Sequence, residues 1–138
     1  MRQVFVDSGH WVALLHPSDV LHERAREVDA QLTGVARVTS DMVLDEVLAY
    51  FRRGGPEPRR AAVQMVRSVL ASSQVTVVPQ TRALFLDAVA MYAQRSDKPW
   101  SLTDCASFVI MRTKHIEDAL AHDEDFVQAG FRALLRAD

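Results

Sequence analysis

The sequence predicts a three-layer α/β/α fold built on a mostly parallel sheet. Short apolar segments that suit buried strands alternate along the chain with longer amphipathic segments that suit helices. Successive strand segments lie too far apart in the sequence for hairpins, so we expect them to pair in parallel through helical connections. No repeat, linker or low-complexity stretch divides the 138 residues, which predicts one domain over residues 1–138.

Each expected element has a local signal. Strands are predicted over 3–6, 35–38, 75–78, 117–121 and 131–135, where apolar residues are concentrated. Helices are predicted between capping residues and the prolines or glycines that stop them. They run from Ser8 to Pro17, from Asp19 to Gly34, from Thr39 or Ser40 to Gly54-Gly55, from Pro56 or Pro58 to Leu70, over 82–95, from Ser101 to Met111, and over 123–129.

Composition indicates an ordinary globular protein of a reducing compartment. Hydrophobic residues make up 49% of the chain and charged residues 25%. The single Cys105 cannot form an internal disulfide, and the apolar start of the chain is too short for a signal peptide or a membrane span. We therefore expect a cytoplasmic protein with no membrane partner.

The charge balance argues against non-specific binding of a polyanion. The net charge is -2 at pH 7, so any nucleic-acid partner must be bound through a local basic group. Four arginines flank the Gly54-Gly55-Pro56 turn and are candidate contacts for RNA phosphates: Arg52, Arg53, Arg59 and Arg60. Read alone, they are more often solvated charges around a loop.

Four acids are candidates for one site. Asp7 directly follows the first strand and Asp123 follows the apolar segment 119–121, while Glu46 and Asp104 lie on helices that follow other connections. In open parallel sheets, ligands bind beyond the carboxyl ends of the strands, where the strand order reverses. We therefore expect the four carboxylates to meet at one rim of the sheet.

Each acid also has a structural alternative. Asp104 fits a capping box with Ser101, Asp7 and Asp123 suit helix N-caps, and Glu46 can be a solvated helix residue. The apolar helix around Asp104 predicts a buried carboxylate that needs a helix end, a distant cation or a metal as its partner. Four converging carboxylates favour a hard divalent cation, Mg2+ or Mn2+, which could activate water against a phosphodiester.

Four stretches of the sequence resemble the motifs of the PIN domain family, in particular its VapC-type toxin branch. The resemblance covers nearly the whole chain. Segment 4–8 resembles the opening strand with its acid, 40–47 the second motif with the acid at Glu46, 101–108 the third motif with the acid at Asp104, and 121–126 the fourth. The alignment, rather than the helix period, selects Glu46 over Asp45, and Asp123 is preferred to Asp125 as the fourth acid.

The resemblance implies an Mg2+- or Mn2+-dependent endoribonuclease on a flavodoxin-like sheet. It also implies a homodimer and a cognate antitoxin, as in a type II toxin–antitoxin pair. The implied catalytic and metal-binding residues are Asp7, Glu46, Asp104 and Asp123. Ser8 and Thr103 adjoin two of these acids and are candidates to support them, as is Asp125.

Two other functions remain open from the sequence. The chain could be an inactive PIN-like module that binds RNA or protein, although it keeps all four acids. It could also accept a phosphoryl group on Asp7, although no second acid stands two residues further on. Trp100, which follows Pro99, could stack on an RNA base or pack in the protein, and packing is the more common role.

Overall fold

A computed structural model describes residues 2–136 and contains a five-stranded sheet in which every described pairing is parallel. The strands are β1 (Gln3–Val6), β2 (Ala36–Ser40), β3 (Val75–Val78), β4 (Asp118–Leu120) and β5 (Arg132–Ala133). Their order across the sheet is β3-β2-β1-β4-β5. The predicted parallel sheet is therefore confirmed.

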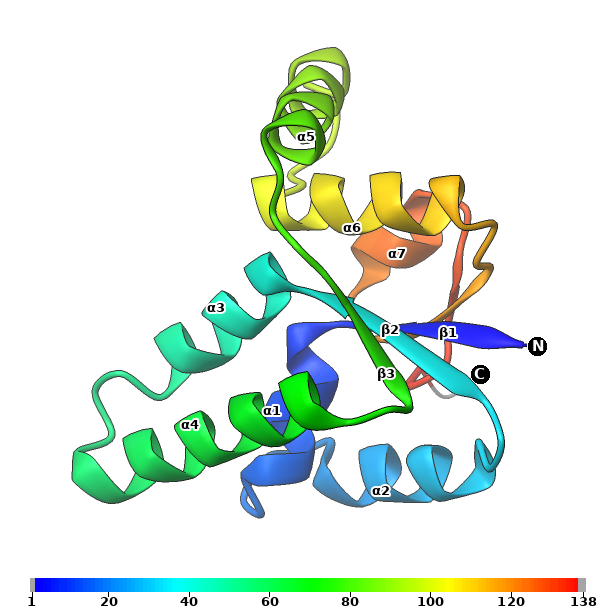
Figure 1. Cartoon of the computed structure of the whole chain (residues 1–138). Helices are drawn as coiled ribbons and strands as arrows, with labels where there is room; N and C mark the ends of the chain where they lie inside the picture. Colours follow the sequence, from blue (N-terminus) through cyan, green and yellow to red (C-terminus); the bar gives the residue numbers. More distant parts are fainter. Residues whose placement is uncertain (1, 137–138) are drawn as a thin grey trace.

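Helices cover both faces of this sheet (Figure 1). They are α1 (Ser8–Leu15), α2 (His22–Gln31), α3 (Asp41–Tyr50), α4 (Pro56–Ala71), α5 (Arg82–Gln94), α6 (Leu102–Thr113) and α7 (Glu124–Gln128). Helices α1, α2 and α4 lie on one side of the strands, with α3 packed on α1 and α4, and α5, α6 and α7 lie on the other. The three predicted layers are present.

The strand order reverses beside β1, at the centre of the sheet. The chain adds β2 and β3 on one side of β1 and then returns to add β4 and β5 on the other. Val6 pairs with Leu120, and the Asp7 backbone N–H donates to the Leu120 carbonyl at 3.2 Å. The carboxyl ends of β1 and β4 therefore lie side by side at the point where open α/β sheets bind ligands.

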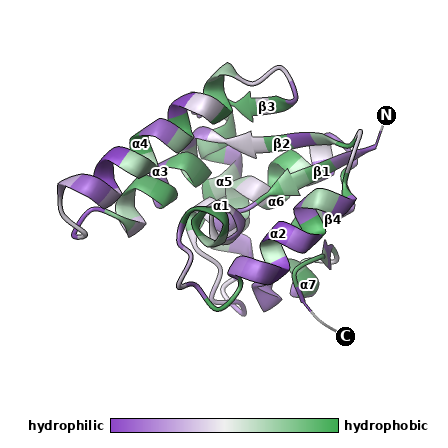
Figure 2. Ribbon diagram, turned by 90° about the horizontal axis from the view of Figure 1, so that it is seen from below, coloured by the Kyte–Doolittle hydropathy of each residue, from purple (hydrophilic) through white to green (hydrophobic). Residues whose placement is uncertain are grey.

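The core lies between the layers, which explains why the central strand is apolar from Val4 to Val6. Val4, Phe5 and Val6 are fully buried because helices cover both sides of β1. Phe108 of α6 contacts Phe126 of α7 edge to face at 5.0 Å between ring centres. Figure 2 shows mostly hydrophilic residues on α2 and hydrophobic ones on β3. Each described helix falls short of the length and apolarity needed to cross a bilayer.

Several predicted boundaries need small corrections, among them the start of α2, whose N-cap is Leu21 and not Asp19. The last strand is only β5, not 131–135, because it is an edge strand that pairs with the short β4 alone. Ser40, not Thr39, caps α3 through its hydroxyl, which accepts from the Val43 N–H. Thr39 is occupied elsewhere, since its hydroxyl donates to the Val6 carbonyl at 2.9 Å.

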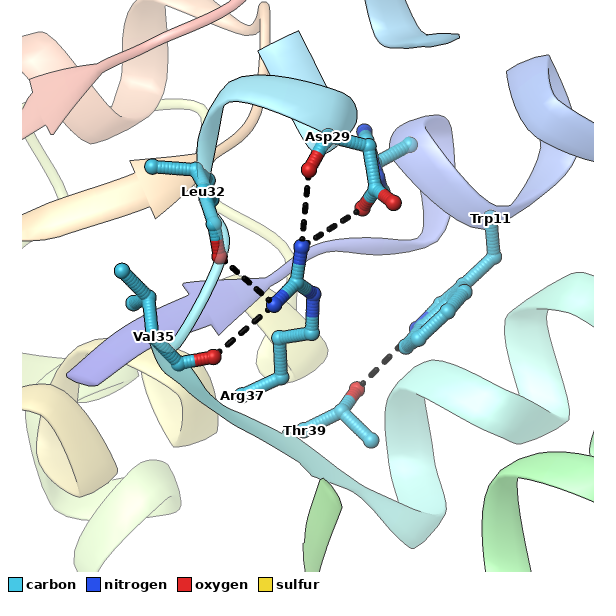
Figure 3. Close-up of polar contacts among 7 residues, drawn as sticks. Trp11, Asp29, Leu32, Val35, Arg37 and Thr39 are labelled. Atoms are coloured by element: carbon cyan, nitrogen blue, oxygen red, sulfur yellow. Dashed lines mark hydrogen bonds and ion pairs between the residues drawn. The ribbon is translucent and has the colours of Figure 1, made fainter. Parts of the chain in front are cut away.

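Arg37 of β2 fixes the end of α2 against the sheet (Figure 3). One terminal nitrogen, Nη1, donates to the carbonyls of Leu32 at 3.3 Å and Val35 at 2.8 Å. The other, Nη2, donates to the Asp29 carbonyl at 3.1 Å and to its carboxylate at 3.2 Å. The planar guanidinium thus adds charged hydrogen bonds to the end of α2 and to the loop that follows it.

We expect Arg37→Lys to lower the free energy of unfolding by about 2 kcal/mol, because an ammonium cannot replace a planar fork of charged hydrogen bonds. Urea unfolding measures the change. Arg26→Lys, at an exposed position of α2, is the matched control and should be neutral. Equal stability of the two variants would contradict this role for Arg37.

Candidate active site

The four predicted acids come from four different parts of the fold and lie at the carboxyl edge of the sheet. Asp7 follows β1 and is the N-cap of α1, and Asp123 follows β4 and is the N-cap of α7. Glu46 lies in α3, and Asp104 lies in the first turn of α6. The ionisation of each of Asp7, Glu46 and Asp104 is affected by the charges of others in this set.

Asp7 is the most strongly perturbed acid of the cluster. Burial is the main cause that raises its pKa to about 8, and the charges of Asp104, Glu46 and Asp123 raise it further, while the Ser8 backbone N–H opposes them. Its side chain makes no capping hydrogen bond to α1, although the residue occupies the N-cap position. The capping alternative is therefore wrong for the Asp7 carboxylate, which remains available for a ligand.

Glu46 is held by hydroxyl groups from the other side of the rim. The Ser8 hydroxyl donates to its Oε1 at 2.8 Å, across 38 positions of sequence. Burial raises the pKa of Glu46, whereas hydrogen bonds from Ser8 and Thr103 lower it. Glu46 is half-buried, so it is not a solvated helix residue. Both predicted supporting hydroxyls, on Ser8 and Thr103, thus lie at one carboxylate.

Asp104 has a structural role as well as a place in the cluster. Its Oδ2 accepts from the Ser101 backbone N–H at 3.0 Å, and the Ser101 hydroxyl accepts from the Asp104 N–H at 3.0 Å. This is the predicted capping box, so the start of α6 gives the half-buried carboxylate part of its compensation. Burial still raises its pKa, and the charges of Asp123 and Glu46 add to that effect.

The two acids of the fourth motif both lie near Asp104. Asp123 is exposed, and its Oδ1 accepts from the Asp125 backbone N–H at 3.0 Å, so it caps α7 as the structural alternative predicted. Asp125 is half-buried, and burial followed by the charges of Asp123 and Asp104 raises its pKa to about 6. The cluster therefore contains five carboxylates, of which the resemblance selects Asp123 as the fourth ligand.

The four arginines lie away from the acids, around the turn that joins α3 to α4 (Figure 1). All four are exposed. Arg52 donates to the Ala49 carbonyl at 2.8 Å, Arg59 donates to the Arg52 carbonyl at 3.0 Å, and Arg60 pairs with Glu57. Three of the four thus make one local hydrogen bond each, and a role in RNA binding stays a prediction.

The donor set fits a hard divalent cation. Within residues 2–136, no three Asp, Glu, His or Cys side chains are already spaced as ligands to one ion. The same part of the chain provides no salt bridge between a Lys or Arg and any of these acids. Half-buried carboxylates that raise one another's pKa lack a positive partner, and oxygen ligands of this kind suit Mg2+ or Mn2+. The cluster therefore fits the metal that the resemblance implies.

We expect Ser8→Ala to weaken Mn2+ binding about tenfold, because Glu46 loses the hydroxyl that orients its carboxylate. Isothermal titration with Mn2+ measures the affinity. Ser73→Ala, at an exposed position before β3, is the control and should bind as the parent does. An unchanged affinity in Ser8→Ala would remove this residue from the site.

Trp100 packs inside the protein, as the more common alternative predicts. Its side chain is 4% exposed and contacts Phe108 edge to face at 4.9 Å between ring centres. The guanidinium of Arg95 lies 4.8 Å from the centre of the indole ring. Trp100 is therefore not available for face-on stacking with a base.

An open parallel sheet with a cluster of carboxylates at its switch point is the arrangement expected of a PIN domain. Residues 4–132 match the family model described as the PIN domain, and the chain belongs to this family. Membership disfavours the alternative in which Asp7 accepts a phosphoryl group.

Among the curated relatives is VapC20 of Mycobacterium tuberculosis, described as a 23S rRNA-specific endonuclease. In strains H37Rv and CDC 1551 / Oshkosh alike, it is 35% identical over 129 residues, covering 93% of this chain and 95% of the relative. The crystal structure of M. tuberculosis VapC20, described as a toxin that cleaves the sarcin–ricin loop, superposes with a TM-score of 0.84 at 32% identity. That match covers 93% of this chain and 95% of the solved one.

Proposed function

We propose that this chain is an Mg2+- or Mn2+-dependent endoribonuclease that hydrolyses RNA phosphodiester bonds, and that it is the toxin of a type II toxin–antitoxin pair. The observation that carries the proposal is the Asp7 carboxylate, which is half-buried, makes no capping bond and lies among three other acids. A carboxylate in this position costs stability unless a cation shares it, so its presence favours a site for metal chemistry.

The residues of the cluster have separate tasks in this proposal. Asp7, Glu46, Asp104 and Asp123 would hold the metal, which supplies a more acidic bound water and positive charge for the phosphate oxygens. Ser8 keeps the Glu46 carboxylate in place through its 2.8 Å hydrogen bond. The Ser101 backbone N–H fixes one oxygen of Asp104, Oδ2. The acids are thus positioned before RNA arrives.

The proposed substrate is the sarcin–ricin loop of 23S rRNA, because the similar VapC20 is described as cleaving it. Arg52, Arg53, Arg59 and Arg60 are the proposed contacts to RNA phosphates on the α3 side of the site, given their exposure. Their contribution should depend on salt, since phosphate contacts release counterions.

A synthetic stem–loop with the sarcin–ricin sequence tests the proposed activity. We expect the purified chain to cut it once in Mg2+ or Mn2+, to stop in EDTA, and to spare a fully paired duplex of the same length. Gel electrophoresis of the end-labelled RNA reports the products. Binding without cleavage in either metal would favour the inactive module instead.

The proposed partners are a cognate antitoxin and a second copy of the chain. Helix α5 exposes three apolar side chains at intervals of three residues, Leu86, Val89 and Tyr92, which is the surface that a homodimer would cover. We place the protein in the cytoplasm, where the buried thiol of Cys105 stays reduced. Light scattering of the purified chain measures the oligomeric state, and the gene immediately upstream is where an antitoxin is expected.

A further inference from the structure

A cavity lies between the end of α5 and the start of α6. It measures about 450 Å3, and its lining includes Tyr92, Arg95, Lys98, Trp100 and Cys105. Cys105 is fully buried and directly follows Asp104 in α6. The floor of the cavity therefore adjoins the helical turn that carries one of the acids.

Trp100, which lines the cavity, has an indole N–H that donates to no acceptor in the described part of the chain. Its side chain is 4% exposed. Leaving a buried donor unpaired costs about 1–3 kcal/mol. The other tryptophan of the chain shows the usual arrangement, since the Trp11 Nε1–H donates to the Thr39 hydroxyl at 3.3 Å. The unpaired donor therefore indicates a site for an acceptor from outside the chain.

Two cationic side chains, Arg95 and Lys98, line the same cavity. The Arg95 guanidinium lies over the Trp100 ring and donates to the two carboxylate oxygens of Asp97 at 3.0 and 3.1 Å. Asp97 balances one of the two positive charges, so the cavity keeps a net attraction for an anion.

These features together match a single unpaired nucleotide. A base offers ring nitrogens and carbonyl oxygens that can accept from an indole N–H, and its planar face can stack on the Arg95 guanidinium. The phosphate of the same nucleotide suits Lys98. A phosphate alone would use the cations but not the aromatic surface.

We infer that this cavity binds one unstacked nucleotide of the RNA substrate next to the scissile bond. The inference rests on the proposed ribonuclease function and adds to it a subsite for substrate selection. The indole N–H is shielded from solvent, so a base must enter the cavity to reach it. The cavity therefore favours loops and bulges over continuous duplexes, whose bases are not free to enter it.

Fluorine NMR of protein labelled with 5-fluorotryptophan tests the inference directly. The chain has two tryptophans, so Trp100 can be assigned with Trp100→Phe. The Asp7→Asn variant is titrated with a single-stranded RNA pentanucleotide and, separately, with a short duplex. We expect the Trp100 signal to move with the single strand, the Trp11 signal to stay, and the duplex to have little effect.

Lys98→Ala supplies a second readout that does not depend on the label. We expect it to weaken binding of the pentanucleotide at least fivefold, whereas Lys114→Ala, at the opposite end of α6, should bind as the parent does. A stationary Trp100 signal, or equal affinities of the two lysine variants, would overturn the subsite. Cleavage by the wild-type chain is scored separately. A moving Trp100 signal without cleavage would refute the proposed nuclease activity but support the nucleotide site. Cleavage with a stationary Trp100 signal would support the nuclease activity but refute the nucleotide site.

Discussion

Asp7→Asn is expected to reduce the cleavage rate of RNA about 10³-fold, the largest effect of any single substitution in this chain. The carboxylate is half-buried and its pKa is raised to about 8, which marks it as a charge that the protein alone does not stabilise. Asparagine keeps the size of the side chain, so the change removes the charge and leaves the packing nearly intact. Single-turnover kinetics on the stem–loop RNA measure the loss.

The control for this prediction is Asp87→Asn, an equivalent change at an exposed position of α5. It should retain the parental rate. If Asp7→Asn cleaves RNA within a factor of ten of the parent, Asp7 does not act in the chemistry and the carboxylate cluster needs another explanation.

The stability of the metal-free protein is expected to fall as the pH rises. The Asp7 carboxyl ionises near 3.8 in the unfolded chain and near 8 in the folded protein. Between these values the folded state holds a proton that the unfolded state has released, so raising the pH favours unfolding. We expect the free energy of unfolding in EDTA to drop by on the order of 3 kcal/mol between pH 5 and pH 7.5.

Urea unfolding at the two pH values measures this slope. Asp7→Asn should remove most of it and should be more stable than the parent at pH 7.5, while Glu46 and Asp104, whose pKa values are also raised, leave a smaller slope in the same direction. Saturating Mn2+ should restore the stability of the parent but not of the variant. A parent more stable at pH 7.5 than at pH 5 in EDTA would contradict the burial of an unpaired acid.

Much of this fold follows from local patterns in the sequence. The alternation of strands and helices predicts a parallel sheet, and a parallel sheet brings strand ends to one edge. This is why Asp7 and Asp123 could be placed at a common rim before any coordinates. The glycine that was predicted to stop the second helix has a local reason as well. Gly34 follows α2 with a positive φ of 78°, a conformation that glycine adopts readily.

Other parts of the site depend on contacts between distant segments. The bond from Ser8 to Glu46 joins residues 38 positions apart, and only the packing of α1 on α3 brings them together. Helix periodicity could not distinguish Glu46 from Asp45, and the resemblance made that choice. Asp104 shows that a capping residue can also belong to the cluster, because its Oδ2 caps α6 while its charge interacts with Asp123 and Glu46.

The cavity beside Trp100 could not be predicted from any sequence motif. Its donor and its cations come from the connection between α5 and α6, where the sequence shows only a short charged stretch before Pro99. Whether an indole N–H finds an acceptor is decided by the three-dimensional surroundings, not by the residue type.

We propose that one divalent ion draws these acids together, and a crystal soaked in Mn2+ shows whether it does. We expect an anomalous peak at the carboxyl ends of β1 and β4, with oxygens of Asp7 and Asp104 as ligands about 2.1 Å away, the distance typical of Mg2+ sites. The same map assigns Asp123 or Asp125 as the fourth ligand. A saturated crystal with no peak at this rim, and with Asp7 bonded only to protein atoms, would show that no shared metal holds the acids.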